Sequence, residues 1–303
     1  MFECDGKLVD EIKKGKRPLN LFTYFILGWI IYIVGALIDL YSQDVIVSFF
    51  KTGSNDTRNL VSFVTMLFGF IYTALMVIII VKYIEHRKLS SLGFQSIGKS
   101  VKAGLFGAIA GIFSVILIMI NLYLMGCVGL SNSPTQTLGI NAFIPIILVF
   151  FGFIVQGGTE ELVSRGWLLN VVSARYGGVM GIIISTLYFA STHLFNAGFN
   201  FIVVINIVLF SLLLCMIVNW TGNLWYAIGF HGAWNFAIGN IFGLDVSGNK
   251  DRVGSLFEFT VSGPSFLTGG KFGIEGGIPT TFILGLLLII IFFVKKYKEL
   301  HET

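Results

Sequence analysis

Long apolar runs without charged residues recur along the chain, and short segments between them carry most of its charge. A run of about twenty apolar residues is long enough for one helix to cross a bilayer. The pattern predicts eight membrane-spanning helices, at roughly residues 19–38, 60–81, 104–126, 141–159, 178–197, 199–219, 222–244 and 277–294. No long polar segment separates them, so we expect a single all-α, polytopic membrane domain over residues 1–303.

The composition supports lipid as the surrounding solvent. Only 12% of the residues are charged, whereas soluble domains carry about 25%. The net charge of +4 comes from short clusters beside the apolar runs, without the basic stripe and interleaved aromatic residues of a nucleic-acid-binding protein. We therefore expect a lipid bilayer as partner and no nucleic acid.

Lysine and arginine concentrate in alternate connections, which indicates an orientation. They lie in the N-terminal tail and after the second, fourth and eighth spans: Lys7, Lys13, Lys14, Lys16, Arg17, Lys82, Arg87, Lys88, Lys99, Lys102, Arg175, Lys295, Lys296 and Lys298. The other connections hold fewer: Lys51, Arg58, Lys250, Arg252 and Lys271. Because basic connections stay in the cytoplasm, we expect both termini there, which requires an even number of spans.

Two connections have a composition of their own. Residues 245–277 are rich in glycine yet contain four phenylalanines, which indicates a folded outer cap or a re-entrant element. Residues 85–102 are basic with Leu92, Phe94 and Ile97 interleaved. This segment fits either a stretch lying along the inner membrane interface or a solvated linker with buried anchors.

The three cysteines, Cys4, Cys127 and Cys215, are far apart in the sequence. This spacing excludes a disulfide framework and a zinc knuckle. We expect Cys127 and Cys215 to be small apolar fillers and Cys4 to lie in the polar N-terminal tail.

Charged residues are almost absent from the middle of the chain. Between residues 103 and 244 they are Glu160, Glu161, Arg165 and Arg175. On a helix, Glu161 and Arg165 share a face and form a favourable pair, whereas Glu160 lies about 100° around the helix. We expect Arg165 to neutralise Glu161 and Glu160 to be left for another partner, as a general base requires.

A structural interpretation of the same segment is also open. Gly157-Gly158 can end the fourth span, and Thr159 can cap a new helix. In that case the two glutamates only complement the dipole of a first helical turn.

The two histidines of the apolar half, His193 and His231, favour a functional site. Glu160 lies 17 residues before Gly177 and His193 lies 16 after it. In an antiparallel helix pair that turns at Gly177, these two side chains have equal depth. His231 enters the membrane from the same side, and Asn235 follows it on the same helix face. We expect these four side chains to meet in the inner half of the membrane.

This combination suits hydrolysis of an amide bond. A carboxylate can take a proton from the attacking water, and imidazole and carboxamide donors can stabilise the oxyanion. Alternatively, His193, His231 and Glu160 could hold Zn²⁺ and activate a bound water. The motif H-E-x-x-H is absent, so the sequence leaves both variants open. Serine and aspartyl chemistry is disfavoured because G-x-S-x-G is missing and Asp39 stands alone in its span.

Three motifs carry a resemblance to a known family. Glu160-Glu161-x-x-x-Arg165, Phe189-x-x-x-His193 and His231-x-x-x-Asn235, in this order, resemble the motifs of the CPBP intramembrane proteases. That family comprises the type II CAAX prenyl endopeptidases and the Abi group of bacteriocin-processing and immunity proteins. The resemblance covers roughly residues 144–244, within a motif core of about 141–244.

The resemblance implies roles for these residues. Glu160 would activate water, with His193, His231 and Asn235 around the scissile carbonyl, and Glu161 and Arg165 as a supporting pair. The implied fold is an eight-helix core with a cavity that opens laterally and toward the cytoplasm. Family members are described both as zinc enzymes and as metal-independent glutamate enzymes. We interpret Phe189 as packing beneath the His193 ring.

The leading hypothesis is an intramembrane endopeptidase in a bacterial cell membrane. Its substrate would be a membrane-associated peptide or protein, in peptide maturation or bacteriocin self-immunity. One alternative is a non-catalytic scaffold or immunity protein that sequesters a partner. A proton-coupled transporter that uses Glu160 is the other, and the lack of an inverted repeat counts against it.

Overall fold

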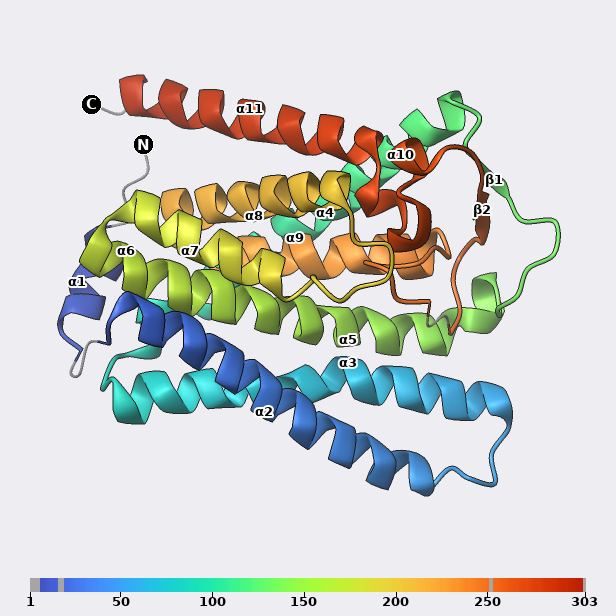
Figure 1. Cartoon of the computed structure of the whole chain (residues 1–303), viewed down its shortest axis with the longest axis horizontal. Helices are drawn as coiled ribbons and strands as arrows, with labels where there is room; N and C mark the ends of the chain where they lie inside the picture. The colour runs from blue at the N-terminus through green and yellow to red at the C-terminus, as the bar shows by residue number, and fades with distance from the viewer. Residues whose placement is uncertain (1–5, 16–18, 251–252, 302–303) are drawn as a thin grey trace.

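The computed structural model of the chain is a bundle of helices with a small cap at one end (Figure 1). It describes residues 6–15, 19–250 and 253–301, so Cys4, Lys16, Arg17 and Arg252 lie outside the described residues. The helices are α1 (Gly6–Lys13), α2 (Leu21–Ser48), α3 (Asn55–Ile79), α4 (Ile97–Leu124), α5 (Phe143–Glu161), α6 (Asn170–Tyr176), α7 (Gly178–Ser191), α8 (Phe201–Thr221), α9 (Trp225–Phe236), α10 (Ser265–Thr268) and α11 (Ile278–His301). The predicted all-α, polytopic membrane fold is confirmed.

Shorter elements extend or join these helices. Three π-helical segments follow α3, α5 and α9, namely Ile80–Ile84, Leu162–Leu169 and Ala237–Ile241. Single 3₁₀ turns cover Leu89–Leu92, Gly139–Ala142, Gly270–Phe272 and Ile274–Gly276. The strands β1 (Val128–Leu130) and β2 (Phe259–Val261) pair antiparallel.

Six helices of the described chain are long and apolar enough to cross a membrane. With their continuations they are Leu21–Ser48, Asn55–Ile84, Leu89–Leu124, Gly139–Tyr176, Phe201–Thr221 and Ile278–Lys298. The other two predicted spans are shorter: α7 has 14 residues, and α9 with its continuation to Ile241 has 17. At 1.5 Å per residue they measure about 21 and 26 Å, against about 30 Å for the hydrocarbon core. The count of eight full spans is therefore not confirmed.

Two predicted helix ends are wrong. The first span was expected to stop before Asp39, but α2 continues to Ser48. The Asp39 carboxylate accepts a hydrogen bond of 3.0 Å from Gln43, one turn later, so the helix accommodates the acidic residue. The break that the sequence left open at Gly157-Gly158 does not occur, although the fourth span was predicted to end at about residue 159. The helix runs from α5 through residues 162–169 into α6, and Thr159 donates to the carbonyl of Phe70 instead of capping a helix.

The chain reverses direction where the sequence predicted. Gly177 separates α6 from α7 with a φ of 88°, a conformation that glycine adopts without strain. Helices α5 and α7 consequently run in opposite directions. The N- and C-terminal ends lie at one end of the bundle, and α10, β1 and β2 lie at the opposite end (Figure 1).

Residues 245–250 and 253–277, here called the cap, form an ordered structure. Within the cap, β2 pairs with β1 and α10 precedes two 3₁₀ turns. Glu258 accepts hydrogen bonds from the backbone N–H and the hydroxyl of Thr135, both at 2.9 Å. The prediction that residues 245–277 are folded is confirmed.

Buried side chains anchor the connection between α3 and α4, which lies at the end of the bundle where the chain begins and ends. Leu92 is buried, as an anchored linker requires, whereas Ile97 is exposed. Glu85 and Arg87 are also buried, and Nε of Arg87 donates to Glu85 at 2.7 Å. Trp167 donates to the same carboxylate at 3.1 Å. This arrangement fits the interpretation as a linker with buried anchors.

Candidate active site

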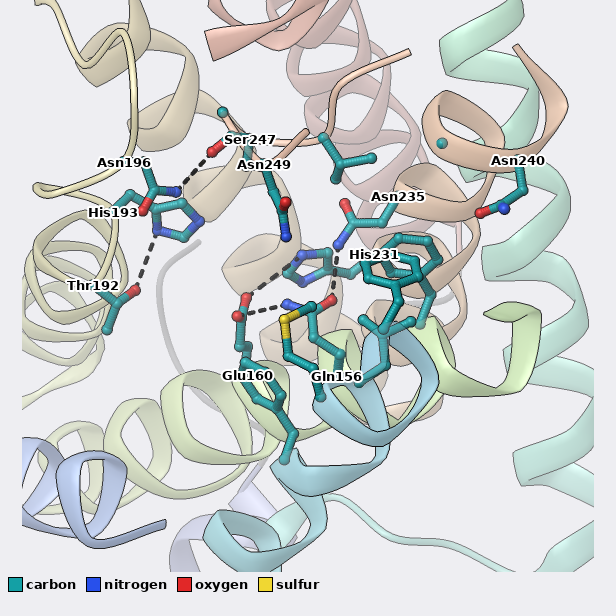
Figure 2. A pocket seen from close by; sticks show the side chains of 18 of the residues that line it. Gln156, Glu160, Thr192, His193, Asn196, His231, Asn235, Asn240, Ser247 and Asn249 are labelled. Carbon is teal, nitrogen blue, oxygen red and sulfur yellow. Dashed lines mark hydrogen bonds and ion pairs between the residues drawn. The ribbon is translucent and has the colours of Figure 1, made fainter. Parts of the chain in front are cut away.

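A cavity of about 290 Å³ lies inside the bundle, between α3, α5, α9, the turn after α7 and residues 246–249 of the cap. Glu160, His193, His231 and Asn235 all line it. Figure 2 shows their side chains around one space, with His193 on the opposite side of that space from Glu160 and His231. The structure thus brings together the four residues that the sequence singled out.

The close approach of α5 and α9 builds this site. A Cβ atom on Gly157 would lie 3.1 Å from the backbone nitrogen of Gly232 and 3.2 Å from Cγ of His231. A Cβ atom on Gly232 would lie 3.0 Å from the carbonyl oxygen of Phe153. Only glycine at both positions leaves the two backbones this close without displacement. Gly157 therefore serves helix packing, which explains why it does not end the helix.

Glu161 is the buried centre of the site. Its Oε1 accepts a hydrogen bond of 3.0 Å from Arg165, and both side chains have no exposed surface. The guanidinium of Arg165 also lies 4.2 Å from the centre of the Phe189 ring, a cation–π contact. The predicted pairing of Glu161 with Arg165 is confirmed.

His231 contacts both glutamates, which the sequence did not predict. Its Nδ1 lies 2.8 Å from Oε1 of Glu161, and its Nε2 lies 3.7 Å from Oε2 of Glu160. Gly157 and Glu161 are four residues apart and share the helix face that meets α9. His231 therefore makes its shorter contact with Glu161. The expectation that Arg165 alone would engage Glu161 is corrected.

The hydrogen bond to Glu161 determines the tautomer of His231. A carboxylate paired with arginine only accepts hydrogen bonds, so Nδ1 must carry the hydrogen. In the neutral ring, Nε2 is then an acceptor, and in the protonated ring it is a donor. In either state Nε2 faces Glu160 across 3.7 Å.

Glu160 has one oxygen held and the other directed at this gap. Oε1 accepts a hydrogen bond of 2.6 Å from Gln156. Oε2 is buried and, within the described part of the chain, has no hydrogen-bond partner. The Glu160 side chain keeps 13% of its surface exposed, whereas that of Glu161 keeps none. The two glutamates thus differ in access to the cavity.

Gln156 connects Glu160 to Asn235. Because a carboxylate only accepts, the NH₂ group of Gln156 must face Glu160, and its Oε1 then faces Asn235. Nδ2 of Asn235 donates to that oxygen at 3.0 Å. The sequence analysis missed Gln156, although its position four residues before Glu160 places it on the same helix face.

His193 follows the C-terminal end of α7. Its Nδ1 lies 2.9 Å from the carbonyl oxygen of Phe189. Since a carbonyl oxygen only accepts, Nδ1 carries the hydrogen, and a neutral His193 presents an accepting Nε2. The ring also lies 4.8 Å from that of Phe189, centre to centre, so the predicted packing of these two rings is confirmed.

The arrangement of donors does not match a zinc site. Among the residues that the structure describes, no three His, Cys, Asp or Glu side chains are gathered closely enough to hold a metal ion. The set considered from the sequence was His193, His231 and Glu160. His193 lies across the cavity from Glu160 and His231, so these three side chains are not gathered around one position (Figure 2).

A third glutamate joins the cap to the site. Oε2 of Glu275 accepts from the backbone nitrogen of Ser247 at 2.6 Å and from its hydroxyl at 2.9 Å. Oε1 accepts from the Trp234 indole at 2.9 Å. Ser247 lines the cavity, and Trp234 lies on the helix that carries His231. The sequence analysis did not single out Glu275, because it lies in a loop with no recognisable motif.

Comparison with known proteins agrees with this geometry. Residues 142–237 match the family model described as type II CAAX prenyl endopeptidase Rce1-like. No curated protein and no solved structure matches the chain. The matched segment covers about a third of the chain and includes all the residues of the three motifs. Through these residues this part of the chain is similar to the type II CAAX prenyl endopeptidase, Rce1-like family.

Proposed function

We propose that this protein is an endopeptidase in which Glu160 activates water for attack on a peptide bond. One observation carries the proposal: Glu160, unlike Glu161, lines the cavity, and its Oε2 has no hydrogen-bond partner among the described residues. Its neighbour Glu161 is held by Arg165 and His231. In this proposal Glu160 acts as the base, and Glu161 positions His231 and Arg165.

The reaction follows from the positions of these groups. Water attacks the carbonyl carbon of the scissile bond, and Oε2 of Glu160 takes one of its protons. The new C–O bond leaves negative charge on the carbonyl oxygen. When this intermediate collapses, the C–N bond breaks and the proton on Glu160 passes to the leaving nitrogen. The products are a new carboxyl group and a new amino group.

Asn235 and the histidines assist these steps. Asn235 uses one N–H on Gln156 and keeps a second for the oxyanion. A protonated His231 would add an N–H from Nε2. Nε2 of a neutral His193 accepts a hydrogen bond and orients the attacking water. For His193 this differs from the donor role considered from the sequence, because its Nδ1 hydrogen is directed at the Phe189 carbonyl.

We further propose that the substrate is a membrane-associated peptide or protein and that the enzyme resides in a bacterial cell membrane. The distribution of Lys and Arg supports an orientation with both termini in the cytoplasm. Maturation of a peptide and bacteriocin self-immunity are the roles that fit best. An immunity protein that only sequesters its partner is the competing function.

The test compares the purified, detergent-solubilised wild-type protein with one isosteric variant. A mixture of synthetic peptides of known sequence serves as substrate, and mass spectrometry detects the products. Glu160→Gln should abolish cleavage while the protein remains folded, since the amide keeps the shape but cannot act as a base. Retained cleavage in this variant would overturn the role of Glu160. A folded wild-type protein that cleaves none of the peptides would favour the sequestering function.

A further inference from the structure

A second cavity lies beside the cavity of the site, toward the cap. This second space, about 600 Å³, shares Phe63 and Met66 with the first. Amide and hydroxyl side chains from three separate parts of the chain line it, together with one aspartate and one lysine of the cap: Gln43, Asn59, Ser62, Thr135, Gln136, Asp245 and Lys250. We call this second cavity the vestibule. Its polar lining suits a segment of polypeptide backbone, which carries many hydrogen-bonding groups.

Both cavities lie in the half of the bundle nearer the cap. Phe63 is eight residues from the start of α3, about 12 Å along the helix, and that start faces the cap end. Glu160 is 17 residues from the start of α5, about 26 Å deep from the same end. The vestibule therefore leads from the cap end down to the glutamates.

The opposite route is filled with side chains. All eight residues of the π-helical segment 162–169, directly after the glutamates, are buried. Trp167 and Leu168 in this segment have no exposed surface, and neither do Leu92 and Leu224 in the connections below it. In the described part of the chain, cap residues thus line the cavity that holds Glu160, and buried side chains pack directly beyond the glutamates on the side of the termini.

This geometry conflicts with one of two expectations from the sequence. The basic connections place the termini in the cytoplasm, whereas the family resemblance implied a cavity that opens toward the cytoplasm. In this fold the cavity and the termini face opposite ends, so both cannot hold. The charge distribution belongs to this chain itself, with Lys82, Lys88, Lys99 and Lys102 at the terminal end. We therefore follow the charge distribution and not the direction of opening that the resemblance implied.

We infer that the site receives its substrate from the outer face of the membrane. The substrate class is then an exported or surface-exposed polypeptide segment, not the cytoplasmic tail of a lipid-modified protein. This inference rests on the proposed function and adds the direction of entry.

The lining of the site cavity narrows the class further. One wall is apolar, formed by Leu67, Phe70 and Phe153 together with the two shared residues. No lysine or arginine occurs among the described residues that line it. A free carboxylate would find no cation there, so the cavity fits an internal peptide bond beside a bulky apolar side chain.

The direction of entry can be tested without any substrate. In a variant whose native cysteines are replaced, a single cysteine is placed at Asn59 in the vestibule or at Ser90 in the connection at the terminal end. Both positions are exposed. Intact bacterial cells are treated with a membrane-impermeant maleimide, and labelling is compared with that in permeabilised cells. Asn59→Cys should be labelled in intact cells, and Ser90→Cys only after permeabilisation. The reverse pattern, or no labelling of Asn59→Cys in intact cells, would overturn the inference.

A second measurement connects the vestibule with catalysis. Each purified single-cysteine variant is assayed on the peptide mixture before and after it is labelled with a polyethylene glycol maleimide. A polymer of about 5 kDa is large enough to fill the vestibule. Cleavage by Asn59→Cys should fall at least about tenfold, and that by Ser90→Cys should not change. Equal effects at both positions would contradict entry through the vestibule. Since the labelling experiment does not depend on activity, its outcome is separate from that of the Glu160→Gln test.

Discussion

Oε1 of Glu161 lies 2.8 Å from Nδ1 of His231 and joins α5 to α9 at the base of the cavity. The same oxygen accepts from Arg165. One buried carboxylate therefore fixes the imidazole and compensates a buried guanidinium. Loss of Glu161 should affect both catalysis and stability.

We predict that Glu161→Gln lowers the cleavage rate at least about 100-fold and lowers the free energy of unfolding. Breaking a buried ion pair by removing one partner costs about 3–5 kcal/mol, because the other charge remains buried. The double variant Glu161→Gln/Arg165→Met should recover much of the stability but not the activity. Thermal unfolding in detergent, followed by circular dichroism, together with peptide cleavage, measures both effects. A double variant less stable than Glu161→Gln would contradict this account.

The chain of hydrogen bonds from Asn235 through Gln156 to Glu160 leads to a second prediction. Gln156→Leu removes both bonds and should reduce the maximal cleavage rate by about 10- to 100-fold, as expected for groups that align a base and an oxyanion donor. Gln95→Leu is a matched control, because Gln95 makes one hydrogen bond to the carbonyl of Gly222 at the other end of the protein. If both variants cleave at the wild-type rate, Gln156 does not position Glu160.

His193 should be required for cleavage despite its distance from the glutamates. His193→Ala removes the acceptor that orients the attacking water, and we expect a fall of at least about 100-fold in the maximal rate with little change in folding. His301→Ala provides the comparison, since His301 is exposed near the end of α11. Full activity of His193→Ala would show that sharing the cavity has no catalytic meaning.

Cleavage should not depend on a tightly bound zinc ion. The described histidines and carboxylates do not form a three-ligand group. We expect the cleavage rate in the presence of 1,10-phenanthroline or EDTA to stay within about twofold of the rate without a chelator. Elemental analysis of the purified protein should find zinc below one ion per chain. Stoichiometric zinc whose removal abolishes cleavage would require a different first step.

The sequence predicted those parts of the site that depend on local spacing. The pair Glu161 and Arg165 follows from a four-residue separation on one helix, and the reversal at Gly177 follows from its glycines. The packing of Phe189 beneath His193 follows from the same rule. Each of these relationships lies within one helix or one turn, where the geometry is known before the tertiary structure.

Other features depend on how helices pack, and spacing does not reveal them. His231 meets Glu161 because Gly157 and Gly232 allow α5 and α9 to touch, whereas the sequence left open that Gly157-Gly158 ends a helix. Residues 162–169 continue the helix in a π conformation that apolar periodicity does not distinguish. The sequence did not reveal the buried pair of Glu85 and Arg87, because the connection around it has the composition of a solvated linker. The two short helices also share their composition with full spans.

The carboxylate of Glu275 accepts from Ser247 in the cap and from Trp234 on α9. These contacts connect the cap residues that line the cavity with the helix that carries His231. A ligand that displaces Ser247 from the cavity must break its contact with Glu275 or shift α9, which positions the His231 imidazole. Entry of the substrate and alignment of the catalytic groups are therefore coupled through Glu275, a residue outside the three motifs that carry the family resemblance.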